Sequence, residues 1–182
     1  MSSRGPSASC RILEALFTAA IVSGTAGAPR AARAAPDGED VPLAVDAGLG
    51  PSFRSVVAEA ADRLGREPCR LLLREFVSRA TGRPLAESLD ATGLAPAQYV
   101  RSIRFRSGRG LSPCGAPGML AYTSPGSRAV VVCPGPLAGF RTGEGTSTVV
   151  VVLHEALHSL GLGEDPPSSR EITAAVRGRC GE

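Results

Sequence analysis

Two histidines and a glutamate lie close together near the C-terminal end of the chain: His154, Glu155 and His158. Side chains four residues apart project from the same face of a helix, so His154 and His158 can present two imidazoles to one point. Two neutral imidazoles at this spacing can hold one Zn²⁺ ion. Glu155 sits beside the first imidazole and can take a proton from a water that the metal activates. The chain has only 2 His in 182 residues, and apolar residues flank both, so the pattern predicts a buried zinc site.

The longer pattern resembles that of the zincin metallopeptidases. His-Glu-x-x-His-x-x-Gly is similar to the metzincin-type branch, in which the glycine, here Gly161, turns the chain back toward the metal. The resemblance implies that the residue ten positions after His154, which is Glu164, is the third metal ligand. Metzincins usually have His there and related secreted bacterial zincins have Asp, so the carboxylate of Glu164 is a chemically sensible departure. Metzincins also have a methionine turn after the motif, whereas no Met follows Met119 in this chain.

Two other acids remain alternatives for the third ligand. Asp165 is the neighbour of Glu164 and can replace it through a small change in the turn. Glu171 suits a longer spacing, but the run Ser168-Ser169-Arg170-Glu171 is also a capping box, which gives Glu171 a structural role of its own.

The resemblance implies an enzyme that hydrolyses peptide bonds in a peptide or protein substrate. Zn²⁺ is the only cofactor expected, and Glu155 is expected to act as the general base. The alternative is a non-catalytic, disulfide-stapled exported binding domain that retains a zincin-like helix. A catalytic zinc site keeps one position open for water, whereas four protein ligands close a structural site. The sequence offers no Cys or further His for a fourth ligand, which favours catalysis.

The first 34 residues are typical of a secretory signal peptide. Arg4 and Arg11 precede a largely apolar stretch, and Ala32-Arg33-Ala34 fits the small-x-small pattern before a cleavage site. The uncharged stretch is shorter than the roughly 20 residues that span a bilayer, although an uncleaved anchor is an alternative. We therefore expect a secreted or periplasmic protein that is not attached to a membrane after cleavage.

The cysteines predict two disulfides in the exported protein. Cys10 would leave with the signal peptide, and four others remain. An even number of cysteines in an exported domain favours disulfides over free buried thiols, and none lies in a Cys-x-x-Cys pair that would suggest structural zinc. We expect Cys114–Cys133 across a hairpin and Cys69–Cys180 between an early helix and the last one.

Charge excludes one class of partner. Residues 35–182 contain 16 Arg and 16 acidic residues, so the body of the protein is neutral. A neutral body offers no electrostatic footprint for nucleic acid. We expect a monomer that binds a peptide or protein.

The remaining pattern predicts an α+β fold, with helices packed on a small, mostly antiparallel sheet. Residues 35–50 are acidic and rich in Gly and Pro, which predicts a flexible mature N-terminus before a zincin-like domain at 51–182. Helical spacing predicts helices at 53–64, 69–80 and 97–102, and a short helix or turn at 85–94. The helix at 69–80 should bury Leu72, Leu73, Phe76 and Val77. Alternation predicts a strand at 103–107, and turn residues 124–127 predict a hairpin of 119–123 with 128–133.

The segment that carries the histidines has conflicting signals. Four consecutive valines favour a strand, but the motif in the second half requires a helix. We predict one buried helix over 147–160, capped by Thr146 or Ser147, and a last helix over 169–179.

Three weaker signals concern substrate binding. Tyr99 or Tyr122 could donate to an oxyanion, although packing is the commoner role of a tyrosine. Arg104, Arg106 and Arg109 could select acidic substrates, although a solvated strand face is the commoner explanation of such residues. The strand at 128–133 could be an edge that pairs with an extended peptide.

Overall fold

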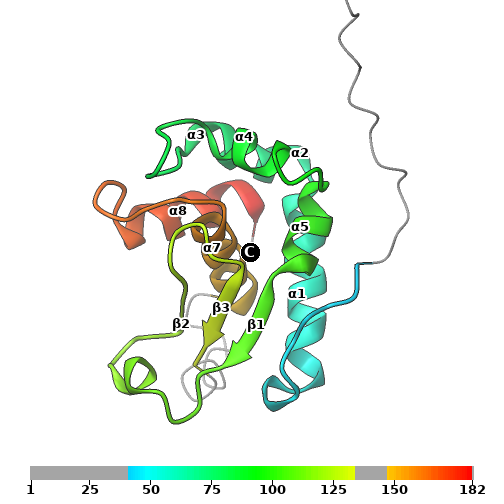
Figure 1. Ribbon diagram of the computed structural model, residues 1–182, viewed down its shortest axis with the longest axis vertical. Helices are drawn as coiled ribbons and strands as arrows, with labels where there is room; N and C mark the ends of the chain where they lie inside the picture. The colour runs from blue at the N-terminus through cyan, green and yellow to red at the C-terminus, as the bar shows by residue number, and fades with distance from the viewer. Residues whose placement is uncertain (1–40, 134–146, 182) are drawn as a thin grey trace, which may run out of the picture. The chain divides into compact units, whose positions relative to one another are not determined.

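The computed structural model describes residues 41–133 and 147–181, which Figure 1 draws in colour. The predicted signal peptide lies outside the described residues. None of the described helices has the length and apolar character needed to cross a membrane.

The described residues form an α+β fold in which helices accompany a three-stranded sheet (Figure 1). The elements in chain order are η1 Ala47–Leu49, α1 Pro51–Leu64, α2 Glu67–Arg70, α3 Leu72–Glu75, α4 Leu85–Asp90, α5 Pro96–Ser102, β1 Arg104–Ser107, η2 Ser112–Gly115, β2 Ala121–Tyr122, β3 Ala129–Val132, α7 Thr148–Ser159 and α8 Ser169–Cys180. The helix that carries both histidines is α7, near the C-terminal end, as predicted.

The sheet is mixed, which corrects the expectation of a mostly antiparallel one. The strand order is β1-β3-β2. The predicted hairpin is confirmed: β2 and β3 pair antiparallel, with Tyr122 opposite Val131. β3 then runs parallel to β1, with Phe105 opposite Val130, because the hairpin inserts its second strand beside β1. β3 is therefore the central strand, so the prediction of a peptide-pairing edge at 128–133 is wrong. Among the described strands, β2 forms the edge on that side.

Helix α7 is buried on every side. It contacts α1, α8 and strands β2 and β3, and every residue from Val149 to Ser159 is buried. Ser147 caps it, since its side chain accepts a hydrogen bond from the Val150 backbone amide at 3.3 Å. A helix surrounded by other elements can be apolar all round, so the valine run serves as core rather than as a strand.

The predicted helix at 69–80 is shorter in the structure, where two short helices replace it: α2 ends at Arg70 and α3 ends at Glu75. Leu72 and Leu73 are buried as expected, but Val77 is 48% exposed. The chain beyond Phe76 is extended because it pairs elsewhere. The Arg79 amide donates to the Gly161 carbonyl at 2.8 Å, so a contact distant in sequence ends the helix.

Both predicted disulfides are confirmed. Cys69 of α2 is bonded to Cys180 of α8, with a Cα–Cα distance of 4.5 Å. Cys114 of η2 is bonded to Cys133, just after β3, with a Cα–Cα distance of 5.3 Å. The first tie joins two helices that are 111 residues apart in the sequence.

Part of the segment predicted to be flexible, residues 35–50, is attached to the fold. Among its described residues, Val45 is buried and bridges Phe105 of β1. The Asp46 amide donates to the Phe105 carbonyl at 2.9 Å. The apolar side chain of Val45 thus docks the N-terminal segment on the outer edge of β1.

Candidate metal centre

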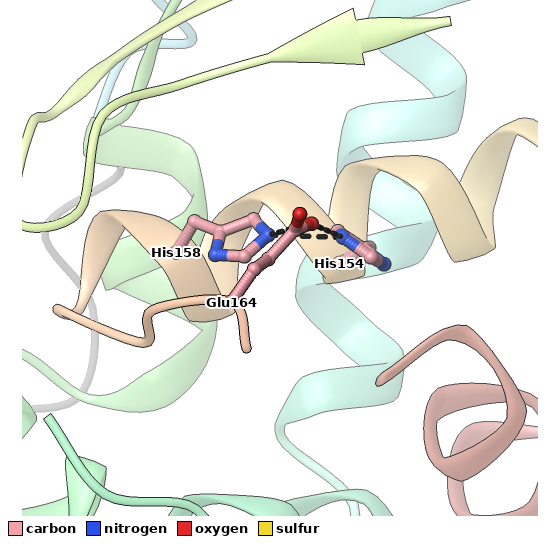
Figure 2. Close-up of side chains that lie close together, drawn as sticks. All are labelled: His154, His158 and Glu164. Carbon is pink, nitrogen blue, oxygen red and sulfur yellow. Dashed lines mark hydrogen bonds and ion pairs between the residues drawn. The ribbon is translucent and has the colours of Figure 1, made fainter. Parts of the chain in front are cut away.

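The structure brings three of the predicted site residues to one point (Figure 2). His154 and His158 project from the same face of α7, and Glu164 reaches them from the loop after the helix. The two Nε2 atoms are 3.0 Å apart. Glu164 Oε1 lies 3.4 Å from Nε2 of His158 and 3.8 Å from Nε2 of His154.

These distances fit one shared cation. A tetrahedral zinc ion with ligand bonds of about 2.0–2.1 Å separates its ligand atoms by about 3.3–3.4 Å. The three separations in the triad, 3.0, 3.4 and 3.8 Å, bracket that value. Two nitrogens and one carboxylate oxygen are also the donor set of many catalytic zinc sites.

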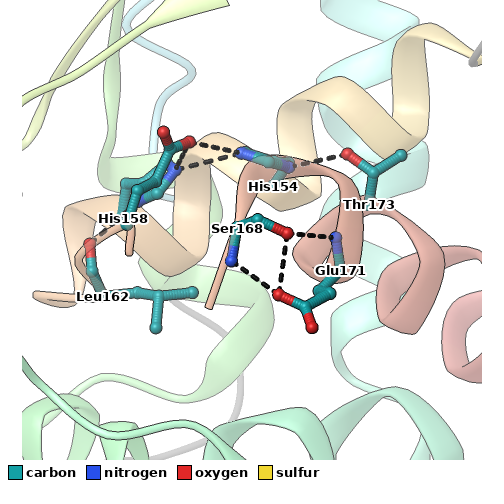
Figure 3. A network of polar contacts seen from close by, with 7 residues as sticks. His154, His158, Leu162, Ser168, Glu171 and Thr173 are labelled. Atoms are coloured by element: carbon teal, nitrogen blue, oxygen red, sulfur yellow. Dashed lines mark hydrogen bonds and ion pairs between the residues drawn. The ribbon is translucent and has the colours of Figure 1, made fainter. Parts of the chain in front are cut away.

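Hydrogen bonds on the far side of each ring orient the imidazoles (Figure 3). His158 Nδ1 lies 2.8 Å from the Leu162 carbonyl oxygen. A carbonyl only accepts, so Nδ1 of His158 carries the proton and its Nε2 presents a lone pair. His154 Nδ1 lies 3.0 Å from the Thr173 hydroxyl, which can accept in the same way. With this tautomer at both rings, two lone pairs face each other across 3.0 Å, which a cation between them satisfies.

Burial keeps the imidazole of His154 neutral. The side chain of His154 is 9% exposed and that of His158 is 8% exposed. Burial, with a smaller contribution from the neighbouring His158, lowers the pKa of His154 to about 4. A neutral imidazole at physiological pH is the form that binds a metal.

Glu155 is a buried carboxyl group without a partner. It is 5% exposed, and its Oε2 has no hydrogen bond within the described structure. Burial, and then the nearby negative charge of Glu164, raises the pKa of Glu155 to about 8. A buried carboxyl group of this kind is costly unless something compensates it, and a divalent cation at the triad would do so. The orphaned oxygen therefore supports the fit of a metal ion to this site.

The turn that delivers Glu164 depends on a glycine. Gly161 has φ +111°, which L side chains rarely adopt, and a Cβ placed on it would lie 2.7 Å from Ser78 Oγ. Ser78 bridges Leu162, and the amide of Arg79 donates to the Gly161 carbonyl. The extended chain after α3 thus fixes the turn at Gly161 and Leu162, which leads to Glu164.

The two alternative ligands do not join the triad. Asp165 is exposed and is not part of the only His/Cys/Asp/Glu group within the described ranges that can hold a metal ion. Glu171 accepts hydrogen bonds from the Ser168 amide at 2.8 Å and the Ser168 hydroxyl at 2.7 Å (Figure 3). These bonds lower the pKa of Glu171 and complete the predicted capping box of α8.

A cavity of about 550 Å³ lies over the triad. Its wall includes the edge strand β2, and Tyr122 is part of that wall. Tyr99 is not: it is buried, and its hydroxyl lies 3.0 Å from Ser159 Oγ, so its role is packing. The cavity lining also includes Arg79, Pro117, Met119, Leu120, Thr123, Val151, His154, Glu155, His158, Glu164, Ser169 and Thr173.

No protein family, curated protein or solved structure matches this chain.

Three residues of this site were not predicted from the sequence: Ser78, Arg79 and Thr173. Each reaches the site through tertiary contacts, and no local pattern in the sequence marks Ser78 or Arg79. Thr173 is the partial exception, because its position two residues after the capping box places it on the first turns of α8.

Proposed function

We propose that this chain is an exported, zinc-dependent peptidase of the zincin type. The observation that carries the proposal is the convergence of two imidazoles and one carboxylate beside a buried, unpartnered Glu155. Structural ion pairs explain a triad of this kind less well, because they leave the buried Glu155 oxygen without a partner.

The residues of the triad would hold the ion. His154, His158 and Glu164 supply three ligands, and the described residues offer no fourth Cys, His, Asp or Glu at this point. A bound Zn²⁺ supplies a Lewis acid that polarises a carbonyl group and lowers the pKa of water. Three protein ligands and an accessible cavity are the arrangement of a catalytic rather than a structural zinc site.

Glu155 would move the proton. It lines the cavity on the same helix as the two histidines, and its Oε2 is committed to no other group. A cation bound at the triad would offset the burial that raises the pKa of Glu155 and so favour its carboxylate form. That carboxylate can accept a proton from the attacking water and return it to the leaving amine. The burial of its neighbours on α7 excludes bulk water from the proton path on that side.

The edge strand provides a place for an extended peptide. Among the described strands, β2 pairs only with β3, and Ala121 and Tyr122 of β2 line the cavity. A peptide that adds as a further strand would lie along the triad, with its backbone held by main-chain hydrogen bonds. The two disulfides support an oxidising compartment, so a secreted or periplasmic location belongs to the same proposal.

Peptide hydrolysis by the zinc-loaded protein tests the proposal. The full chain and its Glu155→Gln variant are exported, loaded with zinc and incubated with a mixture of fluorogenic peptides. We expect equal zinc content in both proteins and a rate that is lower by about 10²–10⁴-fold in the variant. Hydrolysis at the wild-type rate by Glu155→Gln would overturn the mechanism. A zinc-loaded wild type that cleaves no peptide would instead support the non-catalytic binding domain.

A further inference from the structure

One cationic side chain stands in the cavity over the triad. Among the described residues that line it, Arg79 is the only one with a permanent positive charge. Arg79 is exposed, and within the described residues no ion pair engages its guanidinium. Arg83, from the same loop, differs because its Nε lies 2.5 Å from Glu87 Oε2.

The fold holds the stem of Arg79 in place. The Arg79 amide donates to the Gly161 carbonyl at 2.8 Å, which fixes the Arg79 backbone beside the turn that leads to Glu164. A Cβ on Gly163 would lie 2.6 Å from Arg79 Cδ and 3.0 Å from Arg79 Cβ. The methylene stem therefore packs against Gly163, one residue before Glu164, and directs the side chain along the cavity wall.

The charge of Arg79 has no use in the triad itself. In the proposed enzyme, the carboxylate of Glu164 binds the metal ion, and Glu155 accepts and returns a proton. A guanidinium presents a planar fork of donors that matches a carboxylate, and it stays charged at every physiological pH. An accessible, held and unpaired guanidinium beside the reacting centre is suited to a substrate anion.

We propose that Arg79 determines substrate specificity by binding a carboxylate of the peptide. This inference rests on the proposed function, because it assigns a substrate class to the same cavity. The carboxylate can belong to an acidic side chain or to the C-terminus of the peptide, and the two sources share one recognition chemistry. The enzyme would thus favour acidic peptides or cleave near a free C-terminus.

The competing explanation is that Arg79 only supports Glu164. In that case its loss would weaken metal binding and would affect every peptide equally. A specificity role predicts the opposite: unchanged zinc content, and a loss confined to peptides that carry the carboxylate.

Peptide binding to the zinc-loaded protein separates these roles without depending on turnover. The full chain with Glu155→Gln serves as the parent, so that bound peptides stay intact. The probes are one peptide scanned with Glu or Gln at each position, each made with a free or an amidated C-terminus. Affinities are measured by isothermal titration, and zinc content by elemental mass spectrometry.

We expect the parent to bind its best carboxylate peptide about tenfold more tightly than the matched amide. Adding Arg79→Gln should abolish that preference, with zinc content and neutral-peptide affinity unchanged. Arg79→Lys should keep part of the preference, and it provides a second measurement if the Gln variant is unstable. The control Arg83→Gln should keep all of it. A preference for Glu over Gln peptides would identify an acidic side chain as the source of the carboxylate. A preference for the free over the amidated C-terminus would identify the C-terminus.

The proposal is overturned if Arg79→Gln weakens acidic and neutral peptides equally or releases zinc. It is also overturned if the parent does not prefer a carboxylate at any position, or binds none of the peptides at millimolar concentration. Failure of the proposed peptidase activity would appear separately, as a zinc-loaded wild type that binds these peptides without cleaving them.

Discussion

Replacing Thr173 with valine should weaken metal binding while leaving the fold intact. The Thr173 hydroxyl lies 3.0 Å from His154 Nδ1, on the side of the ring away from the triad. Valine has nearly the shape of threonine and a similar helix propensity, so α8 should be preserved. The change removes only the acceptor that fixes the tautomer and the orientation of His154.

The size of the effect follows from the contact. A donor left without a partner costs about 1–3 kcal/mol when it is buried. Thr173 is half-buried, so the lower part of that range applies. Loss of an outer hydrogen-bond partner of a metal-binding histidine typically lowers metal affinity by about 10–100-fold. We expect a value near the tenfold end, about 1.4 kcal/mol.

Competition with a chromophoric chelator measures the zinc affinity of the wild type, Thr173→Val and Thr173→Ser. The serine variant keeps the hydroxyl and is the matched control, so it should bind zinc nearly as well as the wild type. Thermal unfolding of the metal-free proteins shows whether the three folds are equally stable. Equal zinc affinity in all three proteins would refute the idea that Thr173 orients His154.

Three further predictions concern stability. Gly161→Ala should destabilise the protein by about 1–3 kcal/mol, because φ is +111° and the added Cβ would lie 2.7 Å from Ser78 Oγ. Gly178 lies inside α8, and nothing lies near the position of its Cβ. Gly178→Ala should therefore stabilise the protein by about 0.5–1 kcal/mol. Urea unfolding measures both, and a Gly161→Ala protein as stable as the wild type would contradict the account of the turn. Glu171→Gln should lower Tm at neutral pH, because hydrogen bonds from Ser168 lower the pKa of Glu171 and so favour its charged form in the folded state. That stabilisation is present above the ordinary pKa of a glutamate and is lost as the pH falls through the lowered pKa of Glu171. A Tm difference between the wild type and Glu171→Gln that persists unchanged in strong acid would contradict this explanation.

The site could be predicted where local spacing determines geometry. His154 and His158 are brought together by helical periodicity alone, and Glu164 followed from the resemblance of the motif. The capping box of α8 is equally local. The cysteine pairings were also predicted, because a hairpin signal left one plausible partner for each remaining cysteine.

Long-range pairing could not be predicted. The helix expected to continue to residue 80 ends because Arg79 pairs with Gly161, and no feature near Val77 marks that contact. The parallel pairing of β1 with β3 has the same origin, since hairpin signals specify only the antiparallel partner. Arg79 and Thr173 reach the cavity through such contacts, which explains why the sequence did not single them out.

The metal content of the exported protein tests the central claim most directly. Zinc per chain is determined by elemental mass spectrometry for the wild type, His158→Ala and Glu164→Ala, with Glu171→Ala as the control acid outside the triad. We expect about one zinc per chain in the wild type and in Glu171→Ala, none in His158→Ala, and a markedly lower content in Glu164→Ala. A folded wild type that binds no zinc, even when zinc is supplied, would contradict that claim, as would a Glu171→Ala protein that loses the metal while Glu164→Ala retains it.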